Sequence, residues 1–302
     1  MGYLEGISIS ICINIVCVCG LAILTGYMGL FSMGHACFLC MGAYASACLT
    51  KYLGCNFYLA LIAGGAVAGF GSLVIGIPTL RGKISSDCFT IATLGYGEAV
   101  RILISNVGTK TLGGALGLRS IPALTTLPRA ILLAVIAIFL TRNYAKSQHG
   151  RIALAIRDHA DASELLGVNI FKEKLKALVI SAFFCGVGGG MMAHYYVYIV
   201  PNIFGGTMSN NLLTSVVLGG VSSITGPAIA TSALTAMPEV FRFFDNWRLT
   251  IYGLVLIAIM RLRPEGLFAY KELSTSIIHL IRKAKEKISS ARQAEANGKR
   301  GE

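Results

Sequence analysis

The chain has 302 residues, of which 55% are hydrophobic and 13% are charged, and its mean hydropathy is +0.69. This composition excludes an ordinary soluble domain, and the continuous apolar runs exclude a transmembrane β-barrel, whose strands alternate in polarity. We therefore expect an all-α, polytopic transmembrane helical bundle. The apolar runs predict about 8–9 spanning helices, some of them broken or re-entrant.

The net charge of +12 is concentrated beside apolar runs. Of the 26 Lys and Arg, 7 lie in residues 141–178 and 10 in residues 261–302. Loops on the cytoplasmic side of a membrane carry an excess of Lys and Arg. Both stretches, and with them the C-terminus, are expected on the cytoplasmic side of the membrane. Membrane lipid, and not nucleic acid, is the expected partner of this charge.

In the first part of the chain, apolar runs alternate with short breaks. The first run has no basic region before it, so we expect an uncleaved spanning helix and not a signal peptide. Glycines interrupt the chain at 26–34, and His35 opens the next helix. The GxxxG pairs Gly65–Gly69 and Gly186–Gly190 predict close helix packing. The expected spans are residues 6–25, 35–50, 57–77, 88–106, 129–141 and 175–199.

After residue 199, the boundaries between apolar runs are less clear. Residues 208–260 contain three apolar pieces, separated at Gly226-Pro227 and at 242–248. We expect a transmembrane domain over 1–270, with a cytoplasmic connection at about 142–174. A basic cytoplasmic tail follows at 271–302, either as an amphipathic helix on anionic lipid or as a solvated or disordered end.

Motifs of several enzyme classes are missing from the sequence. It contains no GxxxxGK[ST], HExxH or GxSxG run, and its five His lack metal-ligand spacing. Cys37 and Cys40 form a CxxC inside an apolar run, where packing is the expected role. We expect no intrinsic enzyme activity, no catalytic residue, no metal and no cofactor.

A few polar or glycine-rich positions within the apolar runs are candidates for a transport path. Glu98 has Arg101 three residues later, so it forms either a structural ion pair or part of the path. His35 either presents its ring to a pore or forms a packing or interhelical hydrogen-bonding contact. The interruptions at 26–34 and 219–226 lie in opposite halves of the chain, as paired broken helices do in transporters, although two ordinary corners would give the same pattern.

The stretch 150–167, GRIALAIRDHADASELLG, is a polar, helix-like segment between apolar runs. Ile152, Ile156 and Leu166 recur at helical spacing, and charged residues occupy another side. We expect one amphipathic helix that offers a docking face in the cytoplasm.

Together, five stretches resemble the permeases of branched-chain amino acid ABC importers, the LivM-like branch. They read GYMGLFSMGHACFLCMGAYASACL (26–49), TLRGKISSDCFTIATLGYGEAVRIL (79–103), GRIALAIRDHADASELLGVNIFKEKLKALVISAFFCGVGGG (150–190), VVLGGVSSITGPAIA (216–230) and MRLRPEGLF (260–268).

The resemblance implies a subunit that translocates branched-chain or related hydrophobic amino acids. It also implies two ABC ATPase subunits that bind the ATP, a second homologous permease subunit and an extracytoplasmic solute-binding protein. Related permeases carry urea, short amides or other amino acids. The residues that it assigns to ATPase coupling are Arg157, Asp158, Ala162, Glu164 and Gly167. Together with the interruptions above, it marks as translocation path Ser32, Gly34, His35, Gly95, Glu98, Gly219 and Gly220.

Two other functions remain open. An ion-driven secondary transporter would use Glu98 as a proton or cation site and need no ATPase. A membrane scaffold would transport nothing. Neither requires a polar helix between two spans, which is the feature that favours the importer.

Overall fold

The computed structural model describes residues 2–82, 85–107, 112–220, 223, 225–240, 253 and 261. These residues form helices joined by short connections, which confirms the all-α expectation. The predicted tail and the last apolar piece before it lie outside the described residues, apart from Gly253 and Arg261. The elements are α1 (Tyr3–Leu21), η1 (Ala22–Tyr27), α2 (His35–Leu53), α3 (Phe57–Arg81), α4 (Ser86–Asn106), η2 (Gly114–Leu116), α5 (Leu127–Lys146), α6 (Gln148–Asp158), α7 (Ala160–Leu165), α8 (Ile170–Tyr196), η3 (Pro201–Phe204), α9 (Gly206–Gly219) and α10 (Thr225–Val240).

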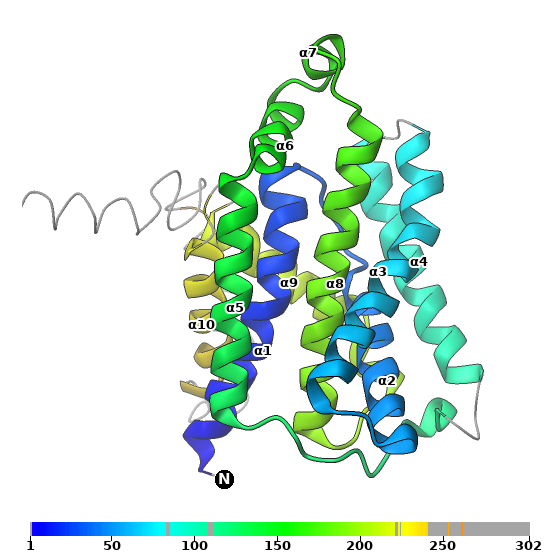
Figure 1. Ribbon diagram of the computed structural model, residues 1–302. Coiled ribbons are helices and arrows are strands. Elements are labelled where there is room, and N and C mark those ends of the chain that lie inside the picture. The colour runs from blue at the N-terminus through cyan, green and yellow to red at the C-terminus, as the bar shows by residue number, and fades with distance from the viewer. Residues whose placement is uncertain are drawn as a thin grey trace, which may run out of the picture.

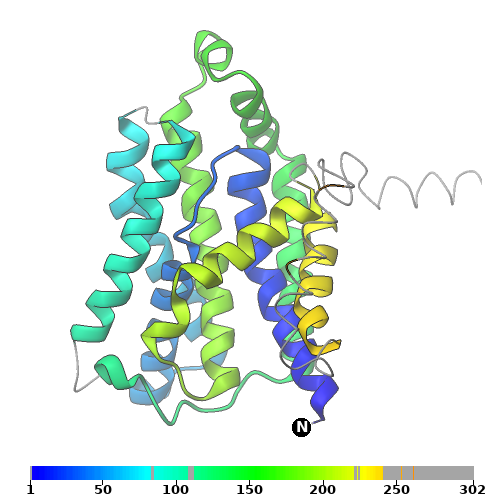
Figure 2. The ribbon, with the colours of Figure 1, turned by 180° about the vertical axis from the view of Figure 1, so that it is seen from behind.

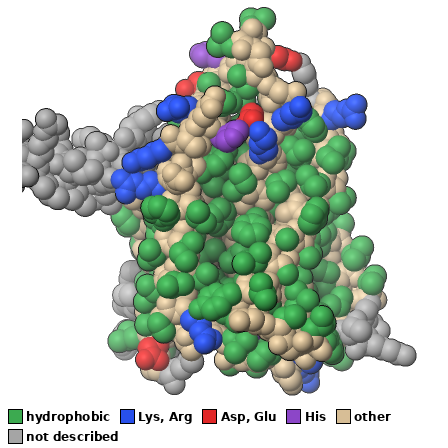
Figure 3. Space-filling view, in the orientation of Figure 1, with side chains coloured by type: hydrophobic (Ala, Val, Ile, Leu, Met, Phe, Trp, Pro, Cys, Tyr) green, Lys and Arg blue, Asp and Glu red, His purple; other side chains and the backbone are tan. Residues whose placement is uncertain are grey.

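Six helices among the described residues are long and apolar enough to cross a membrane: α1 together with η1, α2, α3, α4, α5 and α8. Their outer faces expose large apolar side chains such as Phe70 and Phe139. Figure 3 shows a broad hydrophobic surface, with most Lys and Arg gathered at the end that carries α6 and α7. This distribution suits a bilayer around the bundle and water at the α6–α7 end.

Helix α8 is the centre of the bundle. It packs against α1, α2 and α3, while α5 packs on α1 and α10 lies beside α1 and α9 (Figure 1). Seen from behind, α9 crosses the bundle obliquely toward the top of α10 (Figure 2). With 14 residues, α9 is about 21 Å long, which is shorter than the hydrocarbon core. It is therefore too short to cross the core by itself, in agreement with the expectation that some helices are broken.

Glycines allow the central helices to touch. A Cβ on Gly42 of α2 would lie 2.2 Å from the carbonyl oxygen of Gly186 in α8, and one on Gly190 would lie 2.6 Å from Leu61 of α3. On α3, Gly65 meets Phe183 of α8 in the same way. The predicted close packing at both GxxxG pairs is confirmed, because small residues let the backbones approach.

Adding one methyl group at this interface is expected to destabilise the bundle. A Cβ on Gly189 would lie 2.1 Å from the carbonyl oxygen of Leu39, which is backbone and cannot move aside. Gly189→Ala should therefore lower the free energy of unfolding by about 1–3 kcal/mol. Thermal unfolding in detergent measures this. Gly95→Ala is the control, since among the described residues a Cβ there would meet nothing within 4 Å beyond its own stretch of helix. Equal melting temperatures for the two variants would contradict the packing argument.

The predicted interruption after the first span is present. Helix α1 continues as the π-helix η1, and the chain then turns at Gly29, whose φ of +71° favours glycine. It descends in extended form to mid-bundle, where α2 begins at His35 (Figure 1). The hydroxyls of Ser86 and Thr90 in α4 donate to the carbonyls of Gly29 and Phe31. These hydrogen bonds satisfy backbone carbonyls that have no partner within a helix, as is required inside a membrane.

Several boundaries differ from the sequence expectation. Helix α3 passes through Pro78 to Arg81, and α5 runs on to Lys146, so the connection to α8 is shorter than the predicted 142–174. Gly226-Pro227 lies in the first turn of α10 and not between two pieces. Proline is tolerated there because the backbone N–H groups of the first turn have no partner within the helix, so the N–H that proline lacks is not needed. The break falls instead at Gly220, with φ +107°.

Candidate functional site

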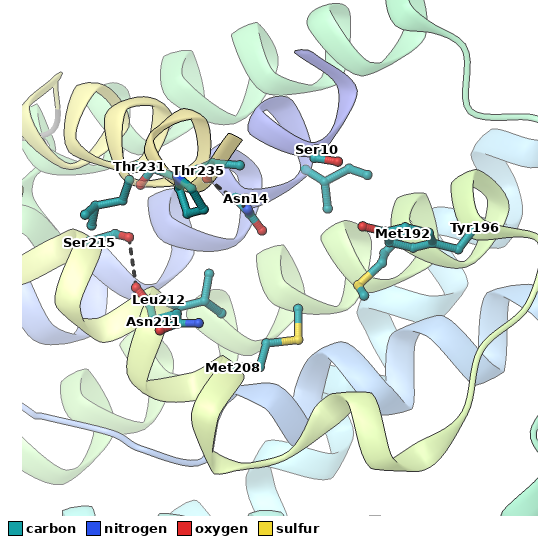
Figure 4. Close-up of a pocket in the computed structure, with 13 residues that line it drawn as sticks. Ser10, Asn14, Met192, Tyr196, Met208, Asn211, Leu212, Ser215, Thr231 and Thr235 are labelled. Atoms are coloured by element: carbon teal, nitrogen blue, oxygen red, sulfur yellow. Dashed lines mark hydrogen bonds between the residues drawn. The ribbon is translucent and has the colours of Figure 1, made fainter. Parts of the chain in front are cut away.

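A cavity of about 540 Å³ lies between α1, α8, α9 and α10. Figure 4 shows Ser10 and Asn14 pointing into it from α1, opposite Asn211 of α9, with Thr235 of α10 beside Asn14. The α1 residues that line the cavity, Ser10, Ile13 and Asn14, lie near the middle of that helix.

The wall of this cavity has polar and apolar parts. The amide Nδ2 of Asn14 donates to the Thr235 hydroxyl at 3.1 Å. The side-chain amide of Asn211 makes no hydrogen bond within the described part of the chain. Ile13, Met192, Met208, Leu212 and Leu234 form the apolar part. Such a wall can accept a small solute that has both polar groups and a hydrocarbon side chain.

The sequence analysis missed these residues. Asn14 stands alone in the apolar run Ile11 to Val18, whereas Asn211 follows Asn210 before another apolar run. An isolated amide within a membrane span marks an interior or a cavity, and this signal was available for Asn14. Only the packing of four helices shows that the two amides share one space.

The predicted path residues of the first interruption lie elsewhere. His35 is 0% exposed; its Nδ1 lies 2.8 Å from the Ser32 hydroxyl and its Nε2 lies 2.7 Å from the Ser181 hydroxyl of α8. A Cβ on Gly34 would meet the carbonyl of Thr93 in α4. This group joins α2, α4 and α8, and in the described conformation it does not line the cavity.

Glu98 and Arg101 form an ion pair at 2.7 Å on α4. Arg101 also donates from Nη1 to the Asn202 side chain in η3, at 2.7 Å. The pair therefore ties the last turns of α4 to the connection between α8 and α9. Gly95, one turn earlier, lies on an exposed face of α4.

The second predicted interruption forms a tight corner. A Cβ on Gly219 would lie 2.3 Å from the backbone nitrogen of Pro227, so α9 and α10 meet without side chains between them. Gly220 is buried at this corner. At this corner the end of α9 and the start of α10, both cavity-lining helices, are in backbone contact.

The polar segment expected as one helix is two. Helix α6 begins after Ser147, whose hydroxyl accepts from the N–H of Gly150, and it ends at Asp158. His159 is extended, with φ −149° and ψ 91°, and α7 follows. The single-helix expectation is wrong, because it assumed one continuous apolar face across His159. The two helices form a lobe above the bundle (Figure 1).

Arg157 points from this lobe into the bundle. Its Nη1 donates to the carbonyl of Gly26 in η1 at 2.7 Å, and its side chain is 20% exposed. A Cβ on Gly29 would lie 2.7 Å from its Cγ, so the stem covers the turn that follows η1. Arg157 thus connects α6 with the broken segment that leads to α2.

The remaining predicted coupling residues lie on the outside. Asp158, Ala162, Glu164 and Gly167 are all exposed, and Gly167 ends α7 with φ +84°. Leu165 and Leu166 are 90% and 85% exposed. The tip of the lobe is therefore apolar between acidic groups, a surface typical of a contact with another chain.

Within the described residues no group of three or more His, Cys, Asp or Glu could hold a metal ion. Cys37 and Cys40 are buried as free thiols in α2, as expected for a packing role.

Comparison with known proteins places the chain in context. A family described as "Branched-chain amino acid transport system / permease component" matches residues 3–260. The high-affinity branched-chain amino acid transport system permease proteins LivM of Escherichia coli K12 and Salmonella typhimurium LT2 are each 30% identical over 282 residues. The match covers 82% of this chain and 66%, just under two thirds, of each relative.

The autoinducer 2 import system permease protein LsrC of Enterobacter sp. strain 638 is 26% identical over 242 residues, covering 76% of this chain and 69% of LsrC. No solved structure matches the chain significantly.

Proposed function

The chain belongs to the family of permease components of branched-chain amino acid transport systems, and on this premise we propose that it is the permease subunit of an ATP-driven importer. Its solutes are branched-chain or related hydrophobic amino acids. It works in the bacterial cytoplasmic membrane with the α6–α7 end and the C-terminus in the cytoplasm, in keeping with the Lys and Arg at that end.

The cavity between α1, α8, α9 and α10 is the observation that carries this proposal. An amino acid needs hydrogen-bonding groups for its ammonium and carboxylate and an apolar wall for its side chain. Asn14 and Asn211 offer the first, and Met192, Met208 and Leu212 the second.

ATP is hydrolysed by other chains in this proposal, because the sequence contains no P-loop. The importer contains two ATPase subunits, and the lobe contacts one of them through Asp158, Ala162, Glu164 and Gly167. A second, homologous permease completes the membrane unit, and an extracytoplasmic binding protein delivers the solute.

In this proposal, the predicted path residues belong to segments that are displaced during transport. Arg157 passes displacement of the lobe to the broken segment with Ser32, Gly34 and His35. Gly219 and Gly220 let α9 and α10 move as a pair, and Gly95 and Glu98 lie along α4.

A different small polar solute is the second candidate. LsrC, with 26% identity, is named for the import of autoinducer 2, so solute identity varies among relatives at this distance. The apolar part of the cavity wall favours a hydrophobic amino acid over a strongly polar solute such as urea.

Co-purification followed by reconstitution tests the proposal. When the chain is purified from its native membrane, two ATPase subunits and a second permease should co-purify with it. In proteoliposomes with the binding protein, the complex should accumulate leucine only with ATP. Uptake by the chain alone, driven by a proton gradient without ATP, would instead identify a secondary transporter. Unchanged leucine uptake after deletion of this chain would identify a scaffold.

A further inference from the structure

An apolar groove with a volume of about 510 Å³ lies between α3, α5 and the first half of α8, away from the cavity. Its floor is the outward face of α8, where Lys176, Val179 and Ile180 lie at helical spacing. Leu73 of α3 forms one wall and Tyr144 of α5 the other. The groove exists because α5 packs on α1 and α3 packs on α8, which leaves this part of α8 uncovered.

One end of the groove is basic. The Glu173 carboxylate is held by Lys176 at 2.7 Å and by His149 at 3.0 Å. The charge of Glu173 is therefore already compensated within the protein. Lys172 lies one turn earlier on α8 with an exposed side chain, and it adds positive charge at the same end.

The change from basic to apolar coincides with the edge of the hydrophobic surface. Figure 3 shows a His and several Lys or Arg side chains meeting the upper margin of this surface, below the α6–α7 lobe. A bilayer places phosphate groups beside hydrocarbon chains at this depth. An extended peptide would instead need polar partners for its backbone along the whole groove, and the apolar floor offers none.

We propose that the groove binds an anionic phospholipid. The phosphate lies at Lys172, beside the Lys176–Glu173 ion pair, and an acyl chain runs over Val179 and Ile180 beside Leu73 and Tyr144. The site concerns the lipid around the bundle and does not rest on the transport function proposed above.

Lipid retention by the full chain in neutral detergent tests the charge part of the site. Native mass spectrometry should show phosphatidylglycerol retained over phosphatidylcholine. Lys172→Ala should weaken phosphatidylglycerol binding about fivefold, the effect expected of one Lys near an anionic headgroup. Lys146→Ala is the matched control, because Lys146 is exposed at the same end outside the groove. Equal retention of the two lipids, or equal effects of the two substitutions, would overturn the proposal.

Filling the groove tests its apolar part without changing charge. Val179→Trp should abolish the preference for phosphatidylglycerol, while Val74→Trp on the exposed face of α3 should leave it intact. A Val179→Trp chain that melts as the parent does without lipid, and still retains phosphatidylglycerol, would place the lipid elsewhere and refute the groove as its site. Should that variant not fold, Val179→Phe serves with the same two outcomes.

Discussion

Replacing Arg157 with Ala is expected to lower leucine uptake by the assembled importer about tenfold to a hundredfold while ATP hydrolysis continues. The guanidinium donates to the Gly26 carbonyl at the end of η1, and its stem covers Gly29. A hydrogen bond from a charged group contributes about 1.5–3 kcal/mol, and each 1.36 kcal/mol corresponds to a factor of ten. Without this bond, displacement of the lobe no longer reaches the segment that leads into α2.

The ratio of solute imported to ATP hydrolysed in proteoliposomes is the measurement. Arg151→Ala is the matched control, since Arg151 is exposed on the same helix. Arg157→Lys keeps the charge and the stem but loses the planar fork, so its ratio should fall between those of the parent and Arg157→Ala. A ratio for Arg157→Ala equal to that of the control would show that the lobe acts through another contact.

Replacing Asn14 with Leu should raise the KM for leucine uptake about fivefold to a hundredfold. Asn and Leu are similar in size, so the change removes the amide from the cavity without filling it. The loss corresponds to about 1–3 kcal/mol for a polar group of the bound solute left without a partner. The Thr235 hydroxyl, which accepts from Asn14, loses that bond as well.

Initial rates of labelled leucine uptake over a range of concentrations give this KM. Ser8→Ala is the control, because the Ser8 hydroxyl donates to the Leu4 carbonyl of its own helix and does not line the cavity. An unchanged KM in Asn14→Leu, with normal assembly, would remove the cavity from the transport path. The family assignment would still stand, because it rests on sequence and not on this cavity.

Periodicity and composition were sufficient for the class of fold. Long apolar runs require helices inside a bilayer. The glycines within residues 26–34 interrupt the first apolar run and so predicted the break before His35. Gly186 and Gly190 predicted close backbone contact because their spacing places two small residues on one face of a single helix. These features depend on neighbours in the chain, so one sequence reveals them.

The tertiary structure alone decided where the polar groups of the candidate sites point. His35 follows a break and carries an ionisable ring, yet packing against α8 places it between two hydroxyls. The direction of Arg157 depends on the bend at His159, where the chain leaves the helical path and a period counted along the sequence no longer applies. Asn14 and Asn211 share a cavity only because α9 crosses the bundle obliquely and meets α1. Such contacts join segments far apart in the sequence, and helical spacing carries no information about how separate helices pack.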